Sequence, residues 1–260
     1  MRRDLETKVV SLCLVVASGT ALCAAEVNFR EPVVLPRPEK LSIRADREVR
    51  LDSAAVFSVA CGEDSAADWV RRKVRAWWKA DVRVEKAEPG SASALLVGAY
   101  RISATPGRVS LEAAGLQGVR YAMYTLRQIA ERDSEGETVR YCRLPALEVE
   151  DAPTMAFRGI HLCWFPEIKA SLIERQIRLA AYYKYNYAVI ESWGVFASER
   201  HPWFAVRDAP MTVAEIRRLK TIADDLGIVL VPQLNVFGHA ACSRAKGGKH
   251  VVLDVHPERQ

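Results

Sequence analysis

The chain has 260 residues, half of them hydrophobic, and its 37 basic and 32 acidic side chains give a formal net charge of +5. This length can bury one large core or two smaller ones. Basic and acidic residues are interspersed, and no basic run resembles a nucleic-acid-binding arm, so we expect no nucleic-acid partner.

The N-terminal segment has the pattern of a secretory signal peptide. Arg2 and Arg3 precede an apolar stretch at 9–16, and small residues suited to cleavage follow it. An uncleaved membrane anchor is the alternative, because the apolar residues at 9–25 nearly reach the length that spans a bilayer. We predict that residues 1–25 are a signal peptide. The mature protein is then expected to be periplasmic or extracellular, without stable insertion in a membrane.

The cysteines suggest free thiols. Cleavage of the signal peptide leaves four of the six cysteines, namely Cys61, Cys142, Cys163 and Cys242. In an exported protein four cysteines can form two disulfides, with three possible connectivities. Their spacing fits no zinc-binding pattern, so no metal is predicted, and buried free thiols are the favoured interpretation.

Between residues 30 and 152, short strand patterns alternate with two helical patterns. Strands are predicted at 49–51, 56–59, 82–84, 94–97 and 108–111. One helix is predicted from Ser65, as its N-cap, to Lys79, and the other at 118–132, followed by a turn at 133–136. Strands mixed with two helices in a segment of this size predict a small α+β domain at 30–152.

After Pro153 the pattern changes to strands that alternate regularly with helices. Strands are predicted at 155–162, 187–191 and 228–231. A capping box of Ser171 and Glu174 is expected to open the first intervening helix, and one of Thr212 and Glu215 the second. This order and spacing predict right-handed βαβ units in a parallel sheet.

Residues 153–260 therefore contain about three βα units of an α/β fold. A closed barrel of eight such units needs about 250 residues. We expect either a small open sheet or the first part of a (β/α)8 TIM barrel, truncated.

Polar side chains accompany each strand of this predicted sheet. They are Arg158 and His161, then Glu191 and Trp193, and then Gln233, Asn235 and His239. Because the C-terminal ends of parallel strands meet at one edge, we expect these groups to gather at one rim. An arginine can donate to neighbouring hydroxyls and a tryptophan face can stack on a sugar ring, so the rim predicts a polyhydroxylated ligand. His161 and His201 are favoured as structural or exposed residues.

Four segments, in this order, resemble glycoside hydrolase family 20, the β-N-acetylhexosaminidases and their relatives. They are 118–129, 150–159, the Lys-Tyr-Asn sequence at 184–186, and 227–239, which ends in Phe-Gly-His. The resemblance implies that residues 30–152 form the small domain that precedes the barrel in this family. It also implies that residues 153–260 are a partial TIM-barrel catalytic domain.

The resemblance implies hydrolysis of terminal β-linked N-acetylhexosamine residues from an oligosaccharide or glycoconjugate. The sequence contains no metal, nucleotide or flavin motif, so we expect no cofactor. In this substrate-assisted retaining mechanism the 2-acetamido oxygen attacks C1, an Asp orients the amide, and the adjacent Glu protonates the leaving oxygen. Arg158 matches the family arginine that binds sugar hydroxyls, and His239 matches the histidine that supports the general acid. Asn235 and Trp193 are further candidates for substrate binding, and Glu191 is a second catalytic candidate.

The chain departs from the family pattern at key positions. Cys163 stands where an Asp is usual, Glu191-Ser192-Trp193-Gly194 replaces a His-x-x-Asp sequence, and Phe237 replaces a common Pro. No Asp-Glu dipeptide occurs in the 260 residues. We therefore expect a divergent branch, represented by an inactive N-terminal fragment. A non-catalytic exported glycan-binding protein and a barrel hydrolase for uronic acid sugars are the alternatives.

Overall fold

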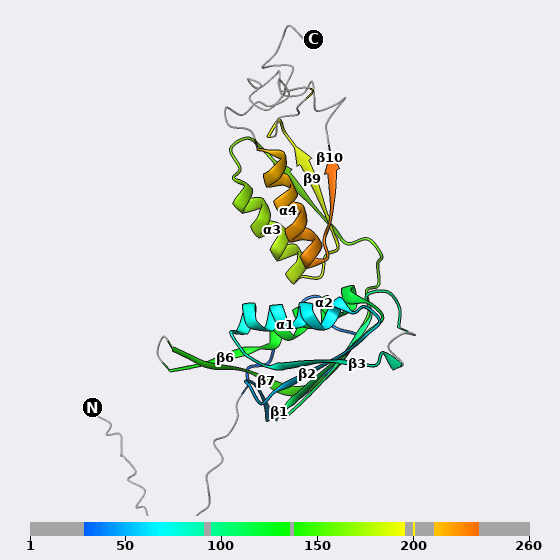
Figure 1. The fold of residues 1–260 in the computed structure, drawn as a ribbon, viewed down its shortest axis with the longest axis vertical. Coiled ribbons are helices and arrows are strands. Elements are labelled where there is room, and N and C mark those ends of the chain that lie inside the picture. The colour runs from blue at the N-terminus through cyan, green and yellow to red at the C-terminus, as the bar shows by residue number, and fades with distance from the viewer. Residues whose placement is uncertain (1–28, 91–94, 136–137, 196–199, 201–210, 234–260) are drawn as a thin grey trace, which may run out of the picture.

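The computed structural model describes residues 29–90, 95–135, 138–195, 200 and 211–233. They form two sheets, each with a pair of helices on one face (Figure 1). The predicted signal peptide lies outside the described residues. Among the residues that are described, no helix is long and apolar enough to cross a membrane.

The first sheet has seven strands in the order β1-β7-β4-β5-β2-β3, and β6 also pairs with β7. The strands are β1 (Lys40–Leu51), β2 (Val56–Cys61), β3 (Arg83–Ala87), β4 (Tyr100–Thr105), β5 (Arg108–Ala113), β6 (Glu131–Glu135) and β7 (Thr138–Asp151). Strand β2 runs parallel to both β3 and β5, and the other pairs are antiparallel. Strands and helices thus mix in this unit as the sequence predicts.

Two helices, α1 (Ser65–Trp78) and α2 (Leu116–Ile129), cover one face of this sheet (Figure 1). Their apolar stripes are buried against it, with Val70 and Val74 from α1 and Ala122 and Leu126 from α2 in one core. Ser65 is the first helical residue and not the N-cap. The N-cap is Asp64, and its side chain makes no capping hydrogen bond.

One strand prediction and one turn prediction in this unit are wrong. A turn at 96–99 stands in place of the end of the strand predicted at 94–97: Ala99 N donates to Leu96 O at 2.9 Å, and Gly98 has φ +82°. A positive φ at the third position is the requirement of a type II turn, which overrides the apolar pattern. Helix α2 also ends at Ile129, so 131–135, which overlap the predicted turn, pair with β7 as a strand.

The second sheet is parallel, as predicted, with the order β10-β9-β8. Its strands are β8 (Gly159–Trp164), β9 (Tyr187–Ser192) and β10 (Val229–Gln233), and its helices are α3 (Ala170–Tyr182) and α4 (Val213–Leu226). Leu162 and Ala188 on the sheet share a core with Ile173 and Ile177 of α3 and with Ala223 of α4. Strand β8 begins four residues later than the strand predicted at 155–162. Met155 and Phe157 are exposed and precede the paired segment.

The two helix starts in this unit differ in how they are capped. Helix α4 has the predicted capping box, in which Glu215 N donates to Thr212 Oγ1 and Thr212 N donates to the Glu215 carboxylate. The predicted box at Ser171 is wrong, because α3 begins after Lys169 without a side-chain cap. Glu174 instead accepts from Arg178 and Arg218, which turn its carboxylate away from the helix end.

The C-terminal end of α4 packs against the first unit. Trp69 Nε1 donates to Asp225 O at 2.7 Å, and Arg120 donates to Asp224 O at 2.9 Å. Lys73 forms an ion pair with the Asp225 carboxylate. These donors satisfy carbonyls that a helix end leaves unpaired. In this arrangement β9 and β10 point away from the first unit. Their C-terminal ends therefore lie at the end of the second unit that is remote from the first (Figure 1).

Candidate functional site

The candidate site lies on the face of the parallel sheet that the helices leave uncovered. Side chains alternate between the two faces of a strand, so His161 and Cys163 of β8 share a face. The register pairs Cys163 with Glu191 of β9 and Glu191 with Gln233 of β10. In-register residues of parallel strands also share a face, so these four side chains form one polar group near the C-terminal ends. We call it the rim group.

Glu191 is at the centre of the rim group. It is only 5% exposed, and its Oε2 lies 2.9 Å from His161 Nε2. The same oxygen accepts a hydrogen bond of 3.1 Å from the Cys163 thiol. Burial, this hydrogen bond and the neighbouring charge of Glu191 raise the pKa of Cys163, so the thiol form is favoured. His161 is exposed, so the group is buried at its carboxylate and open to solvent at its imidazole.

Trp193 lies immediately beyond β9 at the same end of the sheet. Its backbone N donates to Trp164 O at 3.1 Å, which fixes the chain just after the strand. Its ring lies 5.3 Å from the ring of Phe165, in a tilted arrangement. The two rings thus form an aromatic pair beside the rim group, which is the kind of surface that a sugar ring can stack on.

Arg158 does not lie at the rim with the other predicted residues. It comes directly before β8, about 17 Å along the strand from Cys163 at 3.3 Å per residue. Its guanidinium donates to Lys184 O, Met155 O and Tyr121 Oη. Arg158 therefore joins the start of β8 to the first unit. The sequence pattern placed its strand too early and so assigned it to the wrong end.

The remaining residues singled out in the sequence lie beyond the described part of the chain. Asn235 and His239, as well as His201 and Cys242, lie outside the described residues. Among the cysteines that the structure describes, Cys61 and Cys142 are buried free thiols and Cys163 is a half-buried one.

Sequence reasoning missed the importance of two members of the rim group. His161 was assigned a structural or exposed role, and Cys163 was considered only as a departure from a family pattern. A usable signal was present, because a His-x-Cys sequence on one strand places both side chains on the same face. Their proximity to Glu191 depends on the register of β8 with β9, which the sequence does not reveal.

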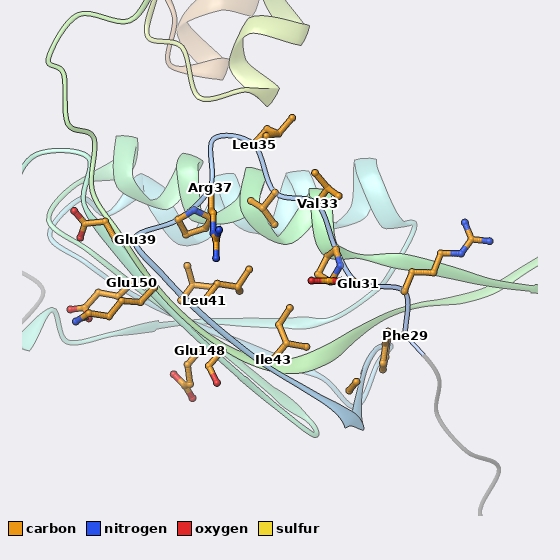
Figure 2. Close-up of a pocket in the computed structure, with 18 of the residues that line it drawn as sticks. Phe29, Glu31, Val33, Leu35, Arg37, Glu39, Leu41, Ile43, Glu148 and Glu150 are labelled. Atoms are coloured by element: carbon orange, nitrogen blue, oxygen red, sulfur yellow. The ribbon is translucent and has the colours of Figure 1, made fainter.

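A separate pocket of about 1180 Å³ lies on the first unit. Figure 2 shows it between the segment that contains Val33 and Leu35 and the strand residues Leu41, Ile43 and Glu150. None of its lining residues belongs to the parallel sheet. The pocket is therefore distinct from the rim group, where the polar side chains of parallel strands converge.

Comparison with known proteins gives the following relationships. Residues 31–152 match the family model for glycosyl hydrolase family 20, domain 2. The chain is 24% identical over 244 residues to a β-hexosaminidase of Vibrio furnissii, covering 80% of this chain and 38% of that protein. It is 29% identical over 171 residues to a β-N-acetylhexosaminidase of Cellulomonas fimi, covering 57% of this chain and 32% of that protein. The chain thus spans less than half the length of either relative.

Solved structures share the fold. The exo-β-N-acetylglucosaminidase of Vibrio harveyi, in complex with N-acetylglucosamine, matches with a TM-score of 0.65 at 20% identity, over 89% of this chain and 40% of that chain. The β-N-acetylhexosaminidase of Bacteroides fragilis NCTC 9343 matches with a TM-score of 0.66 at 24% identity, over 87% of this chain and 48% of that chain. The chain therefore has the mixed α/β fold of these enzymes, and its resemblance to glycoside hydrolase family 20 is confirmed.

Proposed function

We propose that this family 20-like chain is part of a glycoside hydrolase that removes terminal β-linked N-acetylhexosamine residues from oligosaccharides or glycoconjugates. The observation that carries the proposal is the order of two features along the chain. A match to family 20 domain 2 at residues 31–152 is followed directly by parallel strands with a polar rim group. The activity named for the relatives is in keeping with it.

The parallel sheet is proposed to be the first three strands of a (β/α)8 barrel. Its helices cover one face, and its opposite face carries the rim group, which is the arrangement of the outside and inside of such a barrel. The proposed domain ranges are 30–152 for the small domain and 153–260 for the barrel portion. Active sites of these barrels lie at the C-terminal ends of the strands, where Glu191 and Trp193 are found.

The proposed mechanism is the substrate-assisted one, in which the acetamido group of the sugar is the nucleophile. His239 is assigned the support of the general acid, and Asn235 and Trp193 the binding of the sugar. Glu191 is assigned to hold His161, because a buried carboxylate 2.9 Å from an exposed imidazole fixes the orientation of that ring toward a ligand. Arg158 is removed from the set because it lies at the other end of β8.

The amide-orienting Asp and the acid Glu of this mechanism are adjacent in the family, and no Asp-Glu dipeptide occurs in these 260 residues. We therefore expect no turnover from these residues alone. Activity is proposed for a whole protein in which other residues supply the pair. The signal-peptide pattern supports export to the periplasm or the extracellular space. Mass spectrometry of the exported protein should then give a mass that corresponds to the loss of residues 1–25.

Substrate choice by the whole protein tests the proposal. We expect hydrolysis of 4-nitrophenyl N-acetyl-β-glucosaminide and none of 4-nitrophenyl β-glucuronide. The opposite preference would support a hydrolase for uronic acid sugars. Binding of N-acetylglucosamine without hydrolysis of either compound would support a non-catalytic glycan-binding protein. The observation that favours this second candidate is that these 260 residues contain no Asp-Glu dipeptide.

A further inference from the structure

We propose that His161, Cys163 and Glu191 bind a divalent transition-metal ion, with Zn²⁺ as the best match. The three side chains come from two adjacent parallel strands and share one face. Their ligand atoms all lie within 4.8 Å of one another. The inference goes beyond the proposed hydrolase activity, which assigns no metal to the protein.

The distances suit a common cation. His161 Nε2 and Cys163 Sγ lie 2.9 Å and 3.1 Å from Glu191 Oε2. Tetrahedral Zn²⁺, with bonds of about 2.0–2.3 Å, separates its ligand atoms by about 3.3–3.6 Å. The imidazole and thiol atoms thus need to move away from the Glu191 oxygen by about half an ångström. The two lie within 4.8 Å of each other and need a separation of about 3.5 Å, and side-chain rotations supply both adjustments. The backbone of two paired strands holds all three residues in place, as a precise site requires.

The donor types select the metal. An imidazole nitrogen, a thiolate and a carboxylate are the three ligands that Zn²⁺ commonly takes, whereas Ca²⁺ and Mg²⁺ prefer oxygen ligands throughout. Cys163 binds as the thiolate, and its proton passes to solvent. Three protein ligands leave a fourth position for water or a ligand group, which is the pattern of zinc sites that remain open to chemistry.

Access to the site follows from the burial of its members. The His161 side chain is 50% exposed, while the Glu191 side chain is 7% exposed. A cation can therefore enter from the solvent side at His161 and meet a carboxylate that is held at the base of the site. The open fourth position then faces the same rim to which the sugar is assigned.

The spacing of the cysteines did not indicate this site. Zinc sites are recognised in sequences by two pairs of ligands at short separations. Here His161 and Cys163 are close in the sequence, but Glu191 reaches them only through the pairing of β8 with β9. Without a cation the same three groups form a hydrogen-bonded cluster around one carboxylate oxygen, and that is the rival interpretation to be tested.

Metal titration of the whole protein tests the proposal. The protein is stripped with a chelator and titrated with Co²⁺ alone, and then with Zn²⁺ in competition. We expect one equivalent to bind and a thiolate-to-cobalt charge-transfer band to appear. Replacing a residue that only orients a metal ligand costs about 10–100-fold in metal affinity, and replacing a ligand should cost at least as much. Cys163→Ser, His161→Gln and Glu191→Gln should therefore each weaken binding at least about tenfold, and Cys163→Ser should also abolish the band.

Cys61→Ala is the matched control, because Cys61 is a buried free thiol of the first sheet. It should leave both the affinity and the band unchanged. His161→Gln changes an exposed side chain, so we expect this variant to fold. It therefore still tests the metal site if the variant at buried Glu191 fails to fold. Absence of binding, or binding that all three variants retain, overturns the metal site. Neither result bears on hydrolysis of the N-acetylglucosaminide, which is measured separately.

Discussion

Lys184 Nζ lies 3.2 Å from Asp151 Oδ2 in a buried ion pair that joins the two units of the chain. Asp151 ends β7 of the first sheet, and Lys184 follows α3 of the second unit. Tyr100 Oη accepts from Lys184 at 2.8 Å and donates to Asp151 at 2.6 Å. Burial lowers the pKa of the Lys184 ammonium, and the charge of Asp151 opposes that shift. The Lys-Tyr-Asn sequence at 184–186 thus has a structural use at the junction between the units.

Lys184→Met should destabilise the protein strongly. Removing one partner of a buried ion pair leaves an uncompensated charge, here on Asp151, and typically costs about 3–5 kcal/mol. Urea unfolding followed by circular dichroism measures this loss.

Lys40→Met is the control for that variant. Lys40 pairs with Glu150, the neighbour of Asp151, but its side chain is 74% exposed. Solvent screens such pairs, so this variant should unfold at nearly the urea concentration of the wild type. Equal losses in the two variants would contradict the importance of burial at Lys184.

Gly227→Ala should cost more stability than Gly107→Ala. Both glycines have a positive φ, +78° and +80°, so both substitutions bear the strain of the left-handed region, about 1–2 kcal/mol. A Cβ at Gly107 meets nothing within 4 Å, whereas one at Gly227 lies 2.2 Å from Gln117 Oε1 and 2.7 Å from Arg120 Cδ.

The clash displaces Gln117 and Arg120, which are hydrogen-bonded to each other, and Arg120 donates to Asp224 O across the junction. We expect an additional loss of about 1 kcal/mol in Gly227→Ala, the value of one hydrogen bond. Equal free energies of unfolding for the two variants would show that the contact across the junction contributes nothing.

Thr212→Ala and Ser171→Ala should differ, although both residues stand in a capping-box sequence. Thr212 makes the capping bonds of α4, and its loss should cost about 1 kcal/mol. Ser171 is exposed inside α3 and caps nothing, so Ala, the better helix former, should leave the free energy of unfolding unchanged or slightly raised. Comparable destabilisation by both changes, measured by thermal unfolding, would restore the capping role of Ser171.

Arg158→Ala should lower stability without impairing substrate binding. Its guanidinium bonds to the Lys184 and Met155 carbonyls and to the Tyr121 hydroxyl, and hydrogen bonds of charged groups are worth about 1.5–3 kcal/mol. In the whole protein we expect lower resistance to urea and a KM for the N-acetylglucosaminide that stays within about a factor of two. A KM raised about tenfold at unchanged stability would return Arg158 to the sugar site.

The features of the fold that could be predicted are those with a local period. The apolar stripes of α3 and α4 and the short β-branched runs between them indicate a parallel sheet, because helix and strand repeats differ in length. Gly227 and the box at Thr212 mark helix ends through backbone conformation, which is also local. By contrast, the pairing of β1 with β7 joins residues about a hundred positions apart, and nothing local encodes it.

The candidate site was predicted only in part, for the same reason. Glu191 could be identified because it is polar at the end of an apolar strand. Its contact with His161 and Cys163 depends on a register between β8 and β9. Arg158 was assigned to the wrong end because strand β8 starts at Gly159, after exposed residues whose apolar pattern resembles a strand. The predictions for Asn235 and His239 remain predictions.

The rate of hydrolysis of 4-nitrophenyl N-acetyl-β-glucosaminide by the whole protein, with and without Glu191→Gln, tests the central claim most directly. We expect wild-type activity and a fall in kcat/KM of at least about tenfold in the variant, because the amide no longer holds His161 as the carboxylate does. Glu85→Gln, on the first sheet and paired with Arg108, is the matched control and should retain wild-type kcat/KM. No hydrolysis by the whole protein, or equal activity in all three proteins, would contradict a sugar-cleaving site at the ends of β8, β9 and β10.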